Sequence, residues 1–264
     1  MKTASSLTFA DLQRELAQAS DPKRARNVAW FFKTGKGQYG EGDKFCGITV
    51  PVLRKIARRY THLPLADVAK LLRSRLHEHR FAALEILVFQ YEAGDDRIRQ
   101  QVFDFYLQHT RSINNWDLVD TSAPYIVGEH LVSRPRKLLY RLAKSANLWE
   151  RRIAIVATAA FIKRGDLKDA FRISSLLLND THDLIHKAVG WMLREAGKRS
   201  EPALLDFLRK NYSAMPRTAL RYAIERLPAP ARKRALQGIF AAQPAPPKLT
   251  RDSSRFVDNP GSVQ

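Results

Sequence analysis

The chain has 264 residues, and 45 Lys and Arg against 26 Asp and Glu give it a formal net charge of +19. Its single cysteine, Cys46, excludes an internal disulfide framework and a thiolate zinc cluster. The longest largely apolar stretch, Ile153 to Ile162, is too short to span a membrane, and the N-terminus turns polar before a signal-peptide core develops. We therefore expect a soluble cytoplasmic protein of bacterial type.

The positive charge predicts a polyanionic partner. Surplus charge repels itself within a folded domain, and nucleic acid is the commonest polyanion that offsets it. The basic residues are spread along the chain, for example from Arg54 to Arg59 and from Arg232 to Arg234, which suits an extended groove. A membrane surface is less favoured because no basic cluster accompanies an amphipathic terminal helix. A merely soluble basic surface remains an alternative.

Helical signals follow one another along most of the chain. Thr8 with Asp11 marks a first helix start, and Asp21 with Pro22 marks a second. Further patterns with three- and four-residue apolar spacing begin near positions 51, 64, 77, 95, 115, 135, 147, 167, 181, 201, 216 and 230. The sequence predicts an all-α domain over residues 1–240, with Trp30 and Trp149 in its packing.

Two segments depart from this helical pattern. Residues 35–47 hold five of the 12 glycines and predict a glycine-rich loop or short β-hairpin, whose Lys36 and Lys44 are available to phosphates. The segment lacks the GxxxxGK[ST] pattern of a phosphate-binding loop. Residues 241–264 contain four prolines and no helical pattern, so they predict a disordered or extended tail.

A faint repeat of 36 residues relates the segments that start at His79, Asn115, Arg151 and Lys187. This length is typical of two-helix repeats of the HEAT kind, which stack into a right-handed superhelix. One column of the alignment contains Ala83, Val119, Ile155 and Trp191, and the next contains Leu84, Asp120, Val156 and Met192.

Asp120 stands in an apolar column, so its carboxylate must neutralise, pair or face a cleft. Trp116 lies one turn earlier on the same helical face. The column of Trp116 also contains Arg80 and Arg152. If the repeats stack in register, these three residues line one surface with Asp120 nearby. For a lone Trp or Asp, packing and capping remain the more common roles.

Other chemistries find little support. His182 and His186 are four residues apart, but there is no zinc-protease pattern around them and no third ligand is evident, so we expect neither a metal nor a cofactor. No GxSxG motif is present, and Cys46 lacks a neighbouring base.

The sequence resembles the AlkD-type DNA alkylation repair glycosylases, which are built from HEAT-like repeats. The resemblance spans roughly residues 10–235, and its matching stretches are NNWDLVD (114–120), NLWERRIAI (147–155) and HKAVGWMLREAGK (186–198), with weaker likeness at 44–58 and 80–87. It implies a concave basic surface that cradles duplex DNA, and excision of cationic N3- and N7-alkylated purines without base flipping.

The resemblance also implies roles for individual residues. Asp120 is the catalytic carboxylate, Trp116 and Trp191 pack against the deoxyribose, and Arg152 contacts the backbone near the lesion. Other cations expected at the DNA are Arg194, Arg80, Lys187, Lys36, Lys44 and Arg54.

The sequence departs from the family at two places. Phe31 stands where the family often has Tyr, and the 35–47 insert is associated with a subgroup better suited to branched or distorted DNA. Two alternatives to the glycosylase therefore remain: a non-catalytic DNA-structure binder with the same fold, and a helical-repeat scaffold for an acidic protein. A monomer is the default expectation.

Overall fold

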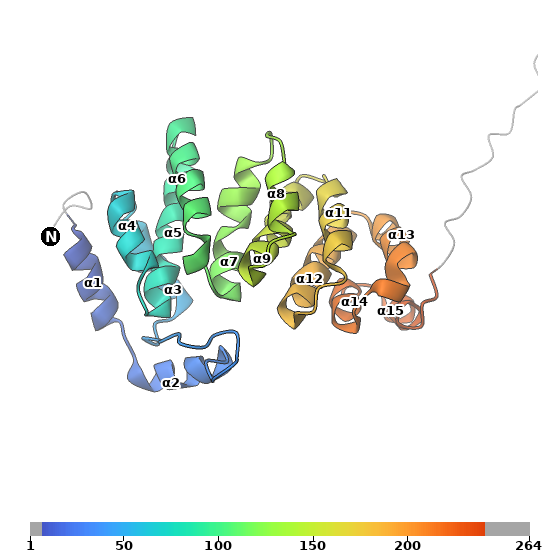
Figure 1. The fold of residues 1–264 in the computed structure, drawn as a ribbon, viewed down its shortest axis with the longest axis horizontal. Coiled ribbons are helices and arrows are strands. Elements are labelled where there is room, and N and C mark those ends of the chain that lie inside the picture. The colour runs from blue at the N-terminus through green and yellow to red at the C-terminus, as the bar shows by residue number, and fades with distance from the viewer. Residues whose placement is uncertain (1–6, 241–264) are drawn as a thin grey trace, which may run out of the picture.

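The computed structural model describes residues 7–240, and the predicted tail at 241–264 lies outside them. The described chain is an all-α solenoid in which successive helices follow one another along the long axis of the molecule (Figure 1). No helix within residues 7–240 combines the length and the apolar character that a membrane span requires.

One layer of the solenoid consists of helices that pack side by side in chain order. Its members are α3 (Val50–Arg59), α5 (His77–Ala93), α7 (Trp116–Ser122), α9 (Leu148–Val156), α12 (Asp183–Arg199) and α14 (Arg217–Ala223). We call it the first layer. Two short segments prolong it: a π-helical turn at Pro124–Gly128 after α7, and α10 (Ala159–Lys163) after α9.

Each helix of the second layer packs against a helix of the first layer that is its neighbour in the chain. It contains α4 (Leu65–Leu72), α6 (Asp96–Gln108), α8 (Lys137–Leu142), α11 (Lys168–Leu177) and α13 (Glu201–Asn211). At the two ends of the solenoid lie α1 (Phe9–Gln18) and α15 (Ala229–Leu236), while α2 (Pro22–Phe31) follows α1 in the chain (Figure 1). Turns of 3-10 helix occur at Thr110–Ser112 and Tyr212–Ala214.

The predicted helix starts are confirmed by their capping bonds. The Thr8 hydroxyl accepts the Asp11 N–H while the Asp11 carboxylate accepts the Thr8 N–H, a reciprocal capping box. The Asp21 carboxylate accepts the N–H groups of Lys23 and Arg24, and Pro22 occupies the first turn of α2.

The 36-residue spacing corresponds to neighbouring helices of the first layer. The four related segments lie on α5, α7, α9 and α12, which contact one another in succession. Leu84, Val156 and Met192 are fully buried in their column, as are Ala83, Val119 and Ile155 in theirs. Asp120 and Trp191, the remaining member of each column, stay partly exposed.

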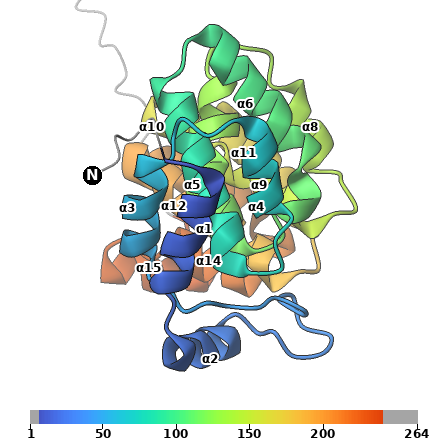
Figure 2. The ribbon, with the colours of Figure 1, turned by 90° about the vertical axis from the view of Figure 1, so that its left-hand side faces the viewer.

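The segment 35–47 is a loop rather than a β-hairpin, because no strand occurs within residues 7–240. A single parallel bridge joins Lys44 to Leu76. Helix α2 and this loop lie to one side of the row of helices (Figures 1 and 2). Gly47 has φ +80°, and a side chain there would meet the Asp21 carbonyl at 2.2 Å, so the close approach of loop and α2 requires glycine.

The two tryptophans expected in the packing differ. Trp149 is buried. The prediction for Trp30 was wrong: the residue is 84% exposed, because α2 buries none of its residues against the solenoid.

Candidate active site

Asp120 lies on α7 of the first layer, where Asn115 caps the helix by accepting the Trp116 N–H at 2.8 Å. Its two carboxylate oxygens accept the Nε and Nη2 groups of Arg152 at 2.9 and 2.7 Å. Nη1 of Arg152 donates to the Leu184 carbonyl at 2.5 Å. Arg152 comes from α9, so the pair joins two neighbouring helices in a bidentate geometry.

The two partners of this pair differ in exposure. The Arg152 side chain is 6% exposed and that of Asp120 is 19% exposed, so the carboxylate keeps a face toward solvent. Burial raises the pKa of Asp120 above its ordinary value, and the charge and hydrogen bonds of Arg152 oppose that rise. The side chain is thus fixed in direction by Arg152 and remains accessible.

A proline shapes the backbone directly after Asp120. Pro124 has no N–H to donate to the Asp120 carbonyl, so the regular helical bond at this position is missing. The following turn is π-helical, with the Gly128 N–H bonded to the Ala123 carbonyl at 2.8 Å. A side chain at Gly128 would meet the Ala157 carbonyl at 2.3 Å, so this turn packs closely against the α9–α10 segment.

The exposed face of Asp120 opens into a hollow of about 490 Å³ formed by α5, α6, α7, the π turn, α10 and α12. Its lining residues are Tyr91, Glu92, Arg99, Asp120, Pro124, Tyr125, Glu129, Ala159, Ala160, Lys163 and Trp191. A neighbouring hollow of about 540 Å³ shares Ala159, Lys163 and Trp191 and adds Lys198 and Arg199. The carboxylate and Trp191, the two irregular members of the repeat columns, therefore border one space.

Trp116, one turn before Asp120 on α7, is not among the residues that line the hollow. Its indole stacks on Phe32 with ring centroids 5.3 Å apart, and Phe31 contacts it edge-on at 6.2 Å. Tyr39 of the glycine-rich loop lies close enough for Trp116 and Lys187 to affect its pKa, which burial raises. The loop thus contributes an aromatic side chain beside α7.

The structure does not bring Arg80 to the predicted surface with Trp116 and Arg152. Arg80 is buried, and its guanidinium bonds the Asp43 carboxylate at 2.6 Å and the Ser74 carbonyl at 2.9 Å. Asp43 comes from the glycine-rich loop, so Arg80 anchors that loop. The guanidinium of Arg152 likewise turns inward to Asp120 and not outward, where a DNA backbone would lie.

The other predicted cations lie at the surface or near it. Arg194 bonds Glu225 and is 18% exposed, and Lys187 pairs with Asp183 at 2.8 Å. Arg54 is exposed and pairs with the buried Glu85 at 3.0 Å, which also accepts the hydroxyl of Thr121 beside Asp120. Lys36 and Lys44 are exposed on the loop.

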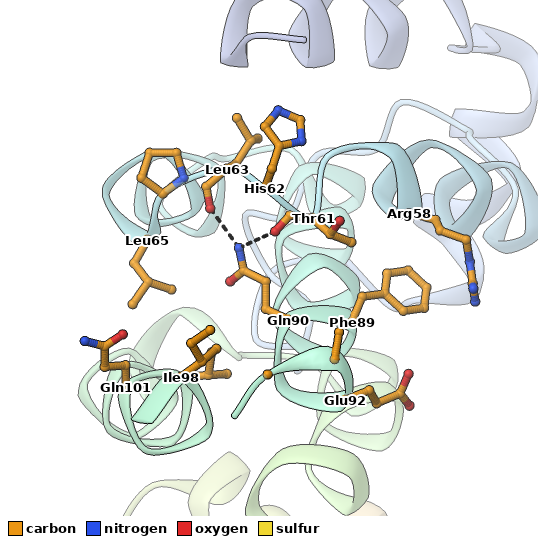
Figure 3. A pocket seen from close by; sticks show the side chains of 14 residues that line it. Arg58, Thr61, His62, Leu63, Leu65, Phe89, Gln90, Glu92, Ile98 and Gln101 are labelled. Atoms are coloured by element: carbon orange, nitrogen blue, oxygen red, sulfur yellow. Dashed lines mark hydrogen bonds between the residues drawn. The ribbon is translucent and has the colours of Figure 1, made fainter. Parts of the chain in front are cut away.

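A larger hollow of about 760 Å³ lies apart from the predicted residues, between the α3–α4 turn and the junction of α5 and α6 (Figure 3). In it the Gln90 amide donates to the carbonyls of Thr61 and Leu63 at 2.8 and 2.7 Å. These bonds tie the α3–α4 turn to α5, which is a packing role. None of the candidate catalytic residues lines this hollow.

Sequence reasoning missed Tyr125 and Lys163, which line the same hollow as Asp120. A proline placed inside a helical pattern, at Pro124, was the signal available for Tyr125.

The two histidines that are four residues apart both have structural bonds. His182 caps α12 by accepting the Leu184 N–H at 3.1 Å, and His186 bonds the Asp180 carbonyl. No cluster suited to a metal ion occurs in residues 7–240.

Comparisons of the sequence and of the structure with known proteins point to the same family. The family model described as DNA alkylation repair enzyme matches residues 12–227. The structure is similar to a solved protein from Enterococcus faecalis described as a predicted DNA alkylation repair enzyme, with TM-score 0.61 and 16% identity over 80% of this chain and 97% of the other. No curated protein sequence matches significantly. The chain therefore belongs to the DNA alkylation repair enzyme family.

Proposed function

We propose that the protein is a monofunctional DNA glycosylase that hydrolyses the N-glycosidic bond of cationic N3- and N7-alkylated purines in duplex DNA, without flipping the base. Membership in the family supports a role in DNA repair with DNA as the partner. The observation that carries the finer proposal is Asp120, a carboxylate fixed by Arg152 yet open to a hollow bordered by the Trp191 indole.

The chemistry needs few groups. A purine alkylated at a ring nitrogen is already cationic, so it leaves as a neutral base and requires no general acid. Loss of the base builds oxocarbenium character on the deoxyribose, as in glycoside hydrolysis. The Asp120 carboxylate stabilises that charge and orients the attacking water, while the electron-rich face of Trp191 favours a cation beside it.

Arg152 has a positioning role in this proposal. Its bidentate bonds hold the Asp120 side chain in one orientation, and its buried charge helps keep the carboxylate ionised against the effect of burial. Trp116 lies one helical turn before Asp120 and stacks on Phe32. In this proposal its indole supports the deoxyribose or its strand from the side of the glycine-rich loop. In this proposal the enzyme acts on the sugar without flipping the base, so discrimination follows the lability of the glycosidic bond.

The test is base release. The protein is incubated with duplex DNA methylated at purines, and released bases are separated by chromatography. Wild type should release 3-methyladenine and 7-methylguanine but not uracil from a uracil-containing duplex, and Asp120→Asn should release both purines far more slowly than wild type. Release of uracil at a comparable rate would contradict discrimination by lability.

A second candidate is a non-catalytic binder of branched or distorted DNA. The observation that favours it is the glycine-rich loop with exposed Lys36 and Lys44, next to a helix that exposes Trp30 and Phe31. Binding to a four-way junction tighter than to a matched duplex, with no release of methylpurine by wild type, would select this function over the glycosylase.

A further inference from the structure

We propose that Tyr125 and Lys163 position the substrate: Tyr125 packs against the nucleotide whose sugar faces Asp120, and Lys163 binds a phosphate of the same strand. The inference rests on the proposed function for the identity of that sugar. The contacts of Tyr125 and Lys163 with DNA can be measured by binding alone. Failure of this inference can therefore be distinguished from failure of the proposed function.

The first step is access to the carboxylate. Both oxygens of Asp120 already accept N–H groups of Arg152, and its open face borders the 490 Å³ hollow. A substrate atom approaching through that hollow meets the side chains that line it. Among them Tyr125 and Trp191 are the aromatic groups on the π turn and on α12, and only Trp191 was anticipated from the sequence.

The second step is the orientation of Tyr125. In an α-helix of 3.6 residues per turn, residues five apart point about 140° apart around the axis. Here the regular α-helical spacing does not hold, because Pro124 interrupts the helix and the following π turn closes on the fifth residue, with Gly128 bonded to Ala123. Asp120 and Tyr125 both border the one hollow.

The third step is exposure. Tyr125 is 47% exposed, whereas the next residues of the π turn, Ile126, Val127 and Gly128, are buried. An aromatic ring on a well-packed backbone has little conformational freedom to lose on binding, so it is an effective contact for a sugar or a base. Tyr125 meets that requirement at the position where a lesion nucleotide approaches Asp120.

Lys163 supplies the complementary charge. It is exposed at the end of α10 and borders both hollows, and no ion pair within the described residues involves it. The adjacent Arg164 is held by Glu129 at 2.6 Å, and Lys198 is held by Glu195 at 2.7 Å. Lys163 therefore has its ammonium group available at the junction of the two hollows, where a phosphate next to the lesion sugar would lie.

Binding of two fluorescent duplexes tests the proposal in the full chain. One duplex carries a central tetrahydrofuran abasic analogue and the other is intact. Tyr125→Ala should weaken binding to the abasic duplex at least fivefold and to the intact duplex by less than twofold, and Tyr125→Phe should bind as wild type. Leu176→Ala, an exposed apolar residue on α11, is the matched control.

The phosphate contact has its own measurement. Lys163→Gln should weaken binding to both duplexes and reduce the salt slope by about one phosphate contact, whereas Lys168→Gln, an exposed lysine on α11, should not. A neutral methylphosphonate beside the abasic analogue should weaken wild type and leave Lys163→Gln unchanged. Thermal unfolding checks that each variant is folded.

Some outcomes overturn the inference. If Tyr125→Ala equals Leu176→Ala on both duplexes, Tyr125 does not contact the substrate. If Lys163→Gln equals Lys168→Gln, or if the methylphosphonate adds to the loss in Lys163→Gln, Lys163 binds no phosphate there. Absence of methylpurine release by wild type would refute the glycosylase while these binding differences would still stand.

Discussion

Two clusters of charged side chains meet on α7, and they differ in one respect. The His77 cluster comprises His77, Asp43, Asp117 and Arg80; its side chains are 3 to 15% exposed, and His77 bonds Asp117 at 2.8 Å and Asp43 at 3.3 Å. The Asp120 pair comprises Asp120 and Arg152, whose side chains are 19% and 6% exposed, and Asp120 lines the 490 Å³ hollow, which no member of the His77 cluster does. One cluster is enclosed by its partners, and the other borders a hollow.

The comparison shows that burial and pairing do not by themselves identify a catalytic carboxylate. Asp43 is at least as well bonded as Asp120, since it accepts from His77, Arg80 and Asn115. Its bonds join the glycine-rich loop to α5 and to the start of α7, and Glu78 of α5 also holds the loop by accepting the backbone N–H groups of Cys46 and Gly47. We infer that the enclosed cluster holds the loop, and that the open pair carries the chemistry.

The largest effect is expected at the open pair. Asp120→Asn removes the charge that stabilises the developing cation, and we expect single-turnover excision to fall about 10²–10³-fold. Arg152 keeps the asparagine oxygen and the Leu184 carbonyl as acceptors, so the variant should remain folded. A variant that loses binding to undamaged duplex as strongly as excision would show that Asp120 only holds the fold or the DNA.

The enclosed cluster should respond in stability instead. Asp43→Ala leaves the buried Arg80 without its carboxylate, and breaking such a pair costs about 3–5 kcal/mol. Urea denaturation should show this loss, and limited proteolysis should cut the 35–47 loop faster than in wild type. An unchanged free energy of unfolding would mean that the loop is held by other contacts, such as those of Glu78.

The same cluster makes stability depend on pH. Burial alone would lower the pKa of His77, but its bonds to Asp117 and Asp43 raise it to about 9 from 6.5. The contribution of protonated His77 to the free energy of unfolding is full below pH 6.5. It falls above that pH, where His77 loses its proton in the unfolded chain, and it is lost above about pH 9. We expect a loss on the order of 3 kcal/mol across this range.

His77→Gln provides the reference for this pH dependence. The variant lacks the titrating group, so the difference in free energy of unfolding between wild type and variant should shrink from pH 6.5 to 9. A difference that stays constant over this range would show that His77 is not protonated in the folded protein.

The smallest effect is expected on the loop surface. Replacing both exposed lysines, Lys36 and Lys44, by Gln should weaken binding to any duplex a few-fold and reduce the salt slope by at most about two contacts. Fluorescence titration over a series of salt concentrations measures this slope. An unchanged slope would place the DNA-facing surface away from the loop.

Part of the site was predictable because local pattern carries it. The repeat spacing marked Asp120 as the irregular member of a buried column, the family resemblance marked Trp191, and both border the hollow. Arg80 occupies the same repeat position as Arg152, yet it turns to Asp43 of the loop. That outcome depends on a segment 37 residues away in sequence, which no periodicity encodes.

The amino-acid sequence alone determined the helical character, the helix starts and the net positive charge, because capping and apolar spacing act over a few residues and charge follows from composition. Only the tertiary structure decided which carboxylate stays open and which is enclosed, whether the glycine-rich segment forms a hairpin, and that Trp30 is exposed. Side-chain pairing and exposure depend on which helices meet, and long-range packing fixes that choice.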